Sequence, residues 1–425
     1  MTPQACSRRW RLGLLSTLVW GLAATALWAG GPLYVAGNTS SAAAQGHAEV
    51  WDTTNPVTYR TASAGKLGKL TNAQATARVQ QLFQFWEDVP TADIRYQNAG
   101  PIQPTGVYAG GAIDTAPKAD AVAGSCQKGT QSPIIFDATG SLFSELGLDP
   151  AVIGFAGACE LDNDGHIMAA EVALNGAWID GNAANGELTD NEFNEAFVHE
   201  FGHFSGLDHS QINADVLLQS QGNCDPAELA GLPVMFPIAQ CQARVDAGLP
   251  MLSPDDMAWI SMLYPETVNN PPAQIPFKSQ YGILSGSVFF HDGSTPAQGV
   301  NVIARSLSNP KGVAFSATSG YLFTGGAGQT VSGDNPGDSG LGSHDPTLIG
   351  TYDIPVLAGT YDISIESIVP GFVGGSGVGA LFFPIAAPGS ASPLSSQSIA
   401  VGAHKTAMDF TCNDSFPRFD QFEPQ

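Results

Sequence analysis

Three of the histidines in this chain lie within one short stretch. Only eight histidines occur in 425 residues, yet three fall in HEFGHFSGLDH, which runs from His199 to His209. On a helix, His199 and His203 project from the same face because they are four residues apart. Gly206 can adopt the left-handed conformation that ends a helix. The spacing therefore predicts a helix that carries two imidazoles and a turn that brings His209 beside them.

Three imidazoles in this arrangement suit a zinc ion. Neutral imidazoles bind zinc at about 2.0–2.1 Å, and three protein ligands plus a water define a catalytic rather than a structural site. Glu200 lies beside the ligands and can hold that water. A bare HExxH also occurs in helices that bind no metal, but HExxHxxGxxH fixes five positions at once. We therefore expect one zinc ion on His199, His203 and His209.

The stretch resembles the zinc-binding motif of the metzincin peptidases, and its GLDHS ending is similar to the matrixin branch. LPVMFP (232–237) is similar to the Met-turn of this family, which would place Met235 beneath the ligands as a hydrophobic base. LSPDDMAWISMLYP (252–265) resembles the closing helix of matrixin catalytic domains, whose acidic pair ties that helix to the Met-turn region. The strand and helix expected over residues 56–89 fit the same fold. The resemblance thus covers residues 50–266.

The resemblance implies a zinc endopeptidase with an α+β catalytic domain, in which a twisted mixed sheet accompanies an active-site helix and a Met-turn. His199, His203 and His209 would bind the metal, which would polarise the scissile carbonyl. Glu200 would be the general base that deprotonates the attacking water and then passes the proton to the leaving amine. The partner would be a protein or peptide substrate, paired in extended form with the strand expected at 166–175.

Some features depart from the matrixin pattern. Little room exists between Ala44 and the first strand for a propeptide whose cysteine would cap the zinc, and Cys126 in AGSCQKG does not match such a switch. Only His166 lies where animal matrixins carry a second, structural zinc site. Met235 follows His209 by 26 residues, a longer gap than typical matrixins show. Neither latency through a cysteine nor a second zinc site is therefore expected.

Two other functions compete with the peptidase. A non-catalytic secreted adhesion or binding protein could retain a zinc-loaded metzincin scaffold. A zinc hydrolase could instead act on a non-peptide bond. Glu200 argues against the binding protein, since a protein that has lost its catalytic activity has no need of the general base. The Met-turn and the closing helix together disfavour the second.

The N-terminus predicts export. Arginines stand at positions 8, 9 and 11, an apolar run follows at 12–30, and three alanines occupy 42–44. This order of basic, apolar and small residues is typical of a secretory signal. Residues 1–44 are therefore expected to form a signal peptide cleaved near Ala44, leaving a secreted protein. An uncleaved membrane anchor is the alternative, because about 20 apolar residues span a bilayer.

Charge and cysteine content agree with an extracellular protein. The chain has 39 acidic and 16 basic side chains, and a net charge of -23 repels phosphate backbones, so no nucleic-acid partner is expected. An oxidising compartment permits disulfides. Neighbours in sequence suggest Cys126–Cys159 and Cys224–Cys241 with Cys412 left over, although sequence does not fix the connectivity.

Helix and strand signals fill residues 48–266, the expected catalytic domain. Capping boxes at Thr71 with Gln74 and at Thr189 with Glu192 each predict a helix start. Ser253 before Pro254 predicts a third. Short strand-like pieces are expected at 55–60, 93–97, 133–137 and 166–175.

Beyond residue 266 the pattern changes. Residues 267–280 are rich in proline and asparagine and read as a linker. Residues 281–412 carry only strand signals and predict an all-β sandwich, followed by a tail at 413–425. SGSVFFHDGSTPAQGVNVIARS and GTYDIPVLAGTYDISIES resemble the prealbumin-like modules called carboxypeptidase regulatory-like domains. An immunoglobulin-like sandwich is the alternative.

A second metal signal is weaker. Asp162, Asn163 and Asp164 stand in the turn LDNDGHI. Oxygen-rich turns can bind Ca²⁺, but this one lacks the spacing and the final glutamate of an EF-hand. An Asx-type turn is the competing interpretation.

Overall fold

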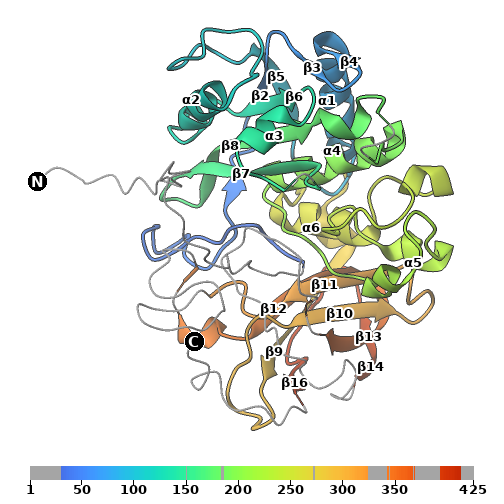
Figure 1. Cartoon of the computed structure of the whole chain (residues 1–425). Coiled ribbons are helices and arrows are strands. Elements are labelled where there is room, and N and C mark those ends of the chain that lie inside the picture. The colour runs from blue at the N-terminus through green and yellow to red at the C-terminus, as the bar shows by residue number, and fades with distance from the viewer. Residues whose placement is uncertain are drawn as a thin grey trace, which may run out of the picture.

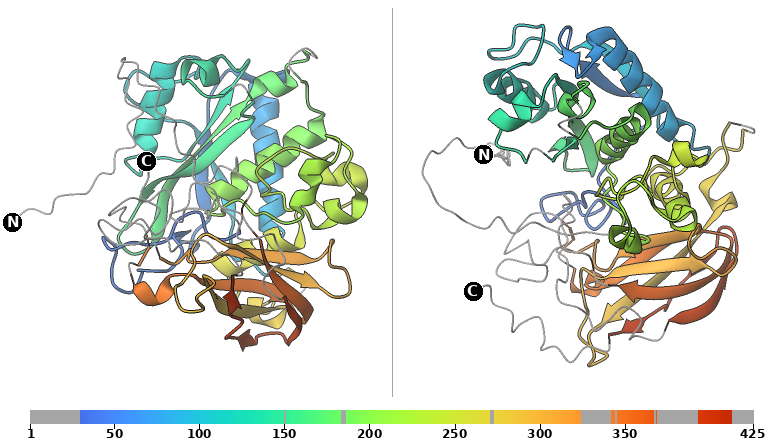
Figure 2. Two further views of the ribbon diagram at one scale, coloured as in Figure 1. Left: turned by 60° about the horizontal axis from the view of Figure 1, so that its bottom comes forward. Right: turned by 45° about the vertical axis from the view of Figure 1, so that its right-hand side comes forward.

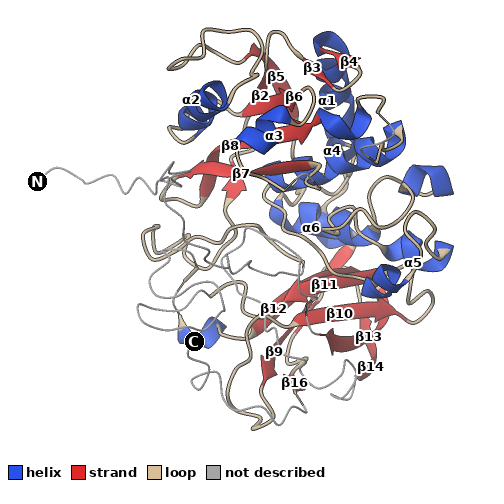
Figure 3. Ribbon diagram, viewed as in Figure 1, coloured by secondary structure: helices blue, strands red, loops and turns tan. Residues whose placement is uncertain are grey.

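The computed structural model describes residues 30–149, 151–182, 186–270, 273–323, 342–343, 345–366, 368 and 393–412. In this part of the chain every α-helix lies before residue 264, and strands with two short 3-10 turns follow. Figures 1 and 3 show the result as a half of helices and strands above a half made of strands. The predicted order, an α+β half and then an all-β half, is confirmed. The expected tail at 413–425 lies outside the described residues.

A six-stranded sheet organises the first half. All of its pairings are parallel except that of β7, which pairs antiparallel with β8 at one edge. A two-stranded ribbon of β3 (Lys66–Leu67) and β4 (Leu70–Thr71) lies apart from it. The sheet consists of β1 (Val50–Trp51), β2 (Val57–Thr61), β5 (Tyr96–Pro101), β6 (Pro133–Asp137), β7 (Gly154–Leu161) and β8 (His166–Asn175), in the order β1-β8-β6-β2-β5 with β7 paired to β8.

The strand that was predicted to pair with substrate, β8, does not lie at the edge of the sheet. β8 was expected to pair with substrate, but β7 covers one side of it and β6 and β1 the other. The apolar run in HIMAAEVALN agrees with this central position in the sheet, because strands that are buried on both faces of a parallel sheet are apolar along most of their length. In the described sheet β7 pairs only with β8, so β7 is an edge strand, as is β5, which pairs only with β2 at the opposite edge.

Three helices begin at the predicted caps: α1 (Asn72–Glu87), α4 (Asp190–Phe204) and α6 (Pro254–Leu263), each with a complete capping box. α1 and α4 pack through the stacked rings of Phe83 and Phe201, whose centroids are 3.9 Å apart. The remaining turns and helices are too short to leave a clear period in the sequence. They are α2 (Ala116–Cys126), α3 (Ser141–Glu145), η1 (Gly176–Ile179), η3 (Ala214–Leu218), α5 (Pro226–Gly231), η4 (Arg244–Ala247), η5 (Phe277–Ser279) and η6 (Pro346–Leu348).

The second half contains two sheets. Their buried apolar side chains, such as Leu284, Val302 and Ile354, belong to one core. The first sheet has the order β11-β10-β13-β14, and the second has β12-β9-β15 with β16 also paired to β9. The strands are β9 (Tyr281–Phe289), β10 (Asn301–Ser306), β11 (Ala314–Thr318), β12 (Thr351–Leu357), β13 (Gly359–Glu366), β14 (Leu394–Ile399), β15 (His404–Lys405) and β16 (Phe410–Thr411).

The two halves are packed directly on each other. α6 contacts β11 and β12, and Trp259 Nε1 donates to Ser316 O at 2.7 Å. The stretch expected as a linker also lies against the first half: Ile275 N donates to Pro90 O at 2.8 Å, and Phe277 is buried. Both views in Figure 2 place the strands of the second half against the helices of the first.

An N-terminal segment, residues 30–49, is part of the fold. Its residues Leu33, Val35 and Ala36 are buried, as is Ala44 next to the predicted cleavage point. Cleavage there would remove side chains that the structure buries. Among the described residues no helix is both long and apolar enough to cross a membrane, and nearly all of the apolar run at 12–30 lies outside them.

Candidate metal centre

The three predicted ligands meet at one point. His199 and His203 lie on the last turns of α4, and Gly206 adopts the predicted left-handed conformation, with φ of 87°. The chain then returns and places His209 beside them. The Nε2 atoms of His203 and His199 are 3.1 Å apart, those of His203 and His209 3.1 Å, and those of His209 and His199 3.2 Å. This group could hold a metal ion.

The triangle of Nε2 atoms fits a small divalent ion. A tetrahedral zinc with bonds of about 2.0–2.1 Å needs its nitrogen ligands about 3.3 Å apart. The observed 3.1–3.2 Å is close to that spacing. The donor set therefore suits a transition metal, and an ion can be accommodated with little movement.

The tautomer of two ligands is set by backbone carbonyls. His199 Nδ1 donates to Val234 O at 2.7 Å, and His203 Nδ1 donates to Leu207 O at 2.8 Å. Each bond leaves the lone pair on Nε2, which is the atom that faces the centre. Burial lowers the pKa of His199 to about 4 and that of His203 to about 3, so both rings are neutral near pH 7.

Glu200 lies beside the edge strand β7. Its side chain is buried, and burial raises its pKa to about 8. A Cβ added at Gly154 of β7 would stand 2.8 Å from Glu200 Cγ, so the strand passes directly over this carboxyl group. A nearby cation favours the ionised form of a carboxyl group. Glu200 is thus a buried carboxyl group that follows the ligand His199 in the chain and lies beside β7.

The floor of the centre is the predicted turn at 232–237. Met235 is buried, and a Cβ at Gly202 would stand 2.2 Å from its Sδ, so glycine at this place lets α4 sit on the methionine. Asp256 accepts from Val234 N at 2.8 Å and from Met235 N at 3.2 Å. One member of the acidic pair therefore ties α6 to this turn, as the resemblance implied.

The other member of the pair makes contacts that the sequence did not indicate. Asp255 accepts from Ser210 Oγ at 2.6 Å and from Ser316 N at 2.9 Å. Ser316 lies on β11 in the second half, in the stretch AFSAT, for which no separate strand was predicted. No motif in the sequence connects residues this far apart.

Both predicted disulfides are present. Cys126–Cys159 joins the end of α2 to β7, and Cys224–Cys241 links the insertion after His209 to the chain just beyond the turn at 232–237. Disulfides indicate an oxidising, extracellular type of environment. Cys412 is buried.

The other candidate sites hold less. Asp162 Oδ1 accepts from Asp164 N at 2.8 Å and from His166 N at 2.9 Å, which is an Asx-type turn. Glu171 lies near Cys126 and Cys159, but sulfurs joined in a disulfide are not thiolate ligands. The Ca²⁺ expectation gains no ligand cluster among the described residues.

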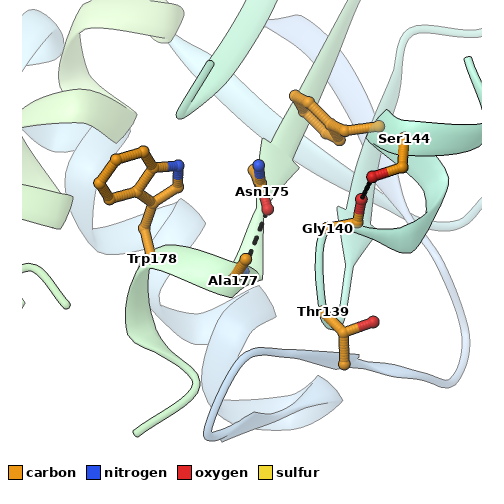
Figure 4. A pocket seen from close by; sticks show the side chains of 7 residues that line it. Thr139, Gly140, Ser144, Asn175, Ala177 and Trp178 are labelled. Carbon is orange, nitrogen blue, oxygen red and sulfur yellow. Dashed lines mark hydrogen bonds between the residues drawn. The ribbon is translucent and has the colours of Figure 1, made fainter. Parts of the chain in front are cut away.

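A pocket opens at the carboxyl ends of β6 and β8, away from the histidines. Asn175 Oδ1 accepts from Ala177 N, and Ser144 Oγ donates to Gly140 O (Figure 4). Its lining contains no titratable side chain, so it offers neither a general base nor a metal ligand. The pocket is lined by Thr139, Gly140, Phe143, Ser144, Asn175, Ala177 and Trp178.

Comparison with known proteins adds little to this geometry. No protein-family model matches the chain, and no curated protein does. Among solved structures, similarity is found to the dioxygenase domain of a dioxygenase carbohydrate-binding protein fusion from the cellulolytic bacterium Streptomyces sp. SirexAA-E, with 18% identity over 31% of this chain and 79% of that one and a TM-score of 0.13. A TM-score this low supports no conclusion about fold or function.

Proposed function

We propose that this protein is a secreted zinc-dependent endopeptidase similar to the matrixin branch of the metzincins. The observation that carries the proposal is the convergence of three neutral imidazoles, at 3.1–3.2 Å between their Nε2 atoms, beside the buried Glu200. The methionine turn below the centre and the closing helix α6 support it. So does the sheet, whose antiparallel edge strand β7 passes over Glu200.

The residues of the chain would share the chemistry as follows. When bound, zinc would supply a Lewis acid that polarises the scissile carbonyl and lowers the pKa of a water. Glu200 accepts the proton of the attacking water on a carboxylate oxygen and returns it to the nitrogen of the leaving amine. The carbonyls of Val234 and Leu207 keep the imidazoles of His199 and His203 in the tautomer that binds metal.

Peptide binding is assigned to β7. An extended substrate would add a strand to the sheet at this edge and obtain main-chain hydrogen bonds from it. The scissile bond would then lie next to Gly154, where the strand crosses Glu200. The all-β half would accompany the enzyme as a module similar to carboxypeptidase regulatory-like domains, with an immunoglobulin-like sandwich as the alternative.

The test compares the full chain with its Glu200→Gln variant. We expect both proteins to bind one zinc and only the parent to cleave an unfolded protein, with cleavage abolished by a chelator. Loss of a general base costs about 10²–10⁴-fold in rate. Glu192→Gln on the same helix is the matched control, because a glutamine at that place preserves the capping box of α4.

Three outcomes would overturn the proposal. Zinc bound by the parent without cleavage of any unfolded protein would favour a binding protein on the same scaffold. Equal cleavage by parent and Glu200→Gln would remove the general base from the mechanism. Cleavage of esters or amides of small molecules, but not of peptides, would point to a hydrolase of another substrate class.

A further inference from the structure

The segment that carries the third ligand has no regular structure of its own. Residues 208–213 form neither helix nor strand, yet all six of them are buried. Within the first half, Ser210 N donates to Met235 O at 2.9 Å. Other elements must therefore fix the remainder of this segment, which we call the ligand loop (208–213).

The second half supplies polar contacts to the ligand loop. Asn301 Nδ2 on β10 donates to Gln211 O at 2.7 Å, and both residues are buried. Arg305 Nη1 on the same strand donates to Asn213 Oδ1 at 2.6 Å. A buried acceptor that loses its donor is left unsatisfied, so these bonds hold the backbone at Gln211 and the side chain of Asn213, two and four residues after His209.

Ser316 on β11 reaches closer to the ligand. Its Oγ is 3.0 Å from Ser210 Oγ, and Ser210 also donates to Asp255 at 2.6 Å. Ser316 N donates to the other oxygen of that carboxyl group at 2.9 Å. Ser210, Ser316 and Asp255 thus form a closed, fully buried network that begins one residue after His209.

The ligand loop also makes an apolar contact with the second half. Ile212 of the ligand loop is fully buried, and the buried cluster to which it belongs consists otherwise of Ile303 on β10 and Ala314 on β11. These neighbours come from the second half. The loop therefore lies on the face formed by β10 and β11, through its side chains as well as its backbone.

The N-terminal segment holds the other side of the loop. Gly30 N donates to His209 O at 2.7 Å, and Asp208 N donates to Gly31 O at 3.0 Å. Gly30 O in turn accepts from Thr318 N of β11 at 3.2 Å. The backbone of His209 is therefore enclosed between residues 30–31 and the sheet of the second half.

We propose that Asn301 and Ser316 of the C-terminal sheet are positioning residues of the metal centre, because they hold the ligand loop and hence His209. The inference rests on the proposed zinc site. It gives the second half a role beyond that of a spacer: the sheet completes the support of the third ligand, whereas the first two are carried on α4 and supported by contacts within the first half. Outer partners of metal ligands of this kind are worth about 10–100-fold in metal affinity.

The test uses the full chain with Asn301→Ala and Ser316→Ala. Lys311→Gln is the matched control, since Lys311 pairs with Glu228 across the same contact between halves but its side chain does not touch the ligand loop. Zinc affinity is measured by competition with a chromophoric chelator. The absorption spectrum of the cobalt(II)-loaded protein reports the geometry of the ligands, and urea unfolding of the metal-free protein reports stability separately.

We expect each positioning variant to bind zinc about 10- to 100-fold more weakly, with a changed cobalt spectrum, while the control keeps the parent values. Ser316→Ala should have no further effect on zinc affinity in a Ser210→Ala background, because its contact to the loop is made through that hydroxyl. Unchanged affinity and spectrum in both variants, with only lower stability, would overturn the inference and leave the proposed function standing. A parent chain that binds no zinc or cobalt would overturn both.

Discussion

The ligands on α4 and the ligand on the loop are held in different ways. His199 and His203 are fixed by a capped helix, whose hydrogen bonds run between residues four apart. His209 follows in an irregular segment, and its backbone is fixed by residues 30–31 and by strands about 100 positions later. The difference teaches that a metal motif contiguous in sequence can have a support that is not contiguous at all. Perturbations far from the motif should therefore affect the two kinds of ligand unequally.

The largest effect is expected from the N-terminal segment. A chain that begins at Gln45 loses the buried Leu33 and Val35 together with the bond from Gly30 to His209 O. Burial of two such side chains stabilises by about 3–6 kcal/mol. Compared with a chain that begins at Gly30, it should be less stable by that amount in urea unfolding and should bind zinc more weakly. Equal stability and affinity of the two chains would show that residues 30–44 do not support the loop.

Removal of each disulfide sharpens the comparison. Replacing both cysteines of either bridge by serine should lower the free energy of unfolding by about 3 kcal/mol in the chain-entropy view. Only the loss of Cys224–Cys241, which joins the chain before the methionine turn to the chain after it, should also weaken zinc binding. Chelator competition on the two double variants is the measurement. Equal zinc affinities of the two double variants would mean that the Cys224–Cys241 disulfide does not help to fix the methionine turn below the histidines.

The carboxyl group of Asp255 gives a pH test of the loop's support. Burial raises its pKa to about 8, from an ordinary value of 3.8. Because the pKa of Asp255 is higher in the folded than in the unfolded protein, protonation of this carboxyl group stabilises the fold at low pH. That stabilisation is lost as the pH rises toward 8. Asp255→Asn lacks this component, so its stability relative to the parent should rise with pH by up to about 1.4 kcal/mol per unit. Urea unfolding of the metal-free proteins between pH 5 and 8 would show it, and parallel curves would contradict it.

The smallest effect is expected at the start of α4. Thr189→Ala removes the N-cap side chain that accepts from Glu192 N, which costs about 1 kcal/mol of stability. Zinc affinity should stay at the parent value, because His199 and His203 lie in the last turns of the helix and are held by packing on Met235 and α1. A fall in zinc affinity as large as that expected for Asn301→Ala would erase the distinction between helix and loop.

Much of the fold was predictable because its causes are local. The capping boxes at Thr71 and Thr189 and the proline after Ser253 set helix starts within a few residues. Loss of helical periodicity after residue 266 indicated the all-β half. The edge strand β7 was missed because GFAGACEL has a weak apolar pattern, and the pairing of β8 was misjudged because sequence does not give the order of strands.

For the site, the sequence by itself determined the three imidazoles, the adjacent carboxyl group, the turn at Gly206 and the methionine below, since all of these follow from spacing along a helix and its return. The tertiary structure alone decided what surrounds the third ligand. Asn301, Ser316 and Gly30 reach the ligand loop only after two sheets and an N-terminal segment have packed together. Their contacts depend on how whole elements are placed relative to one another. The local sequence around each of these residues does not indicate that placement.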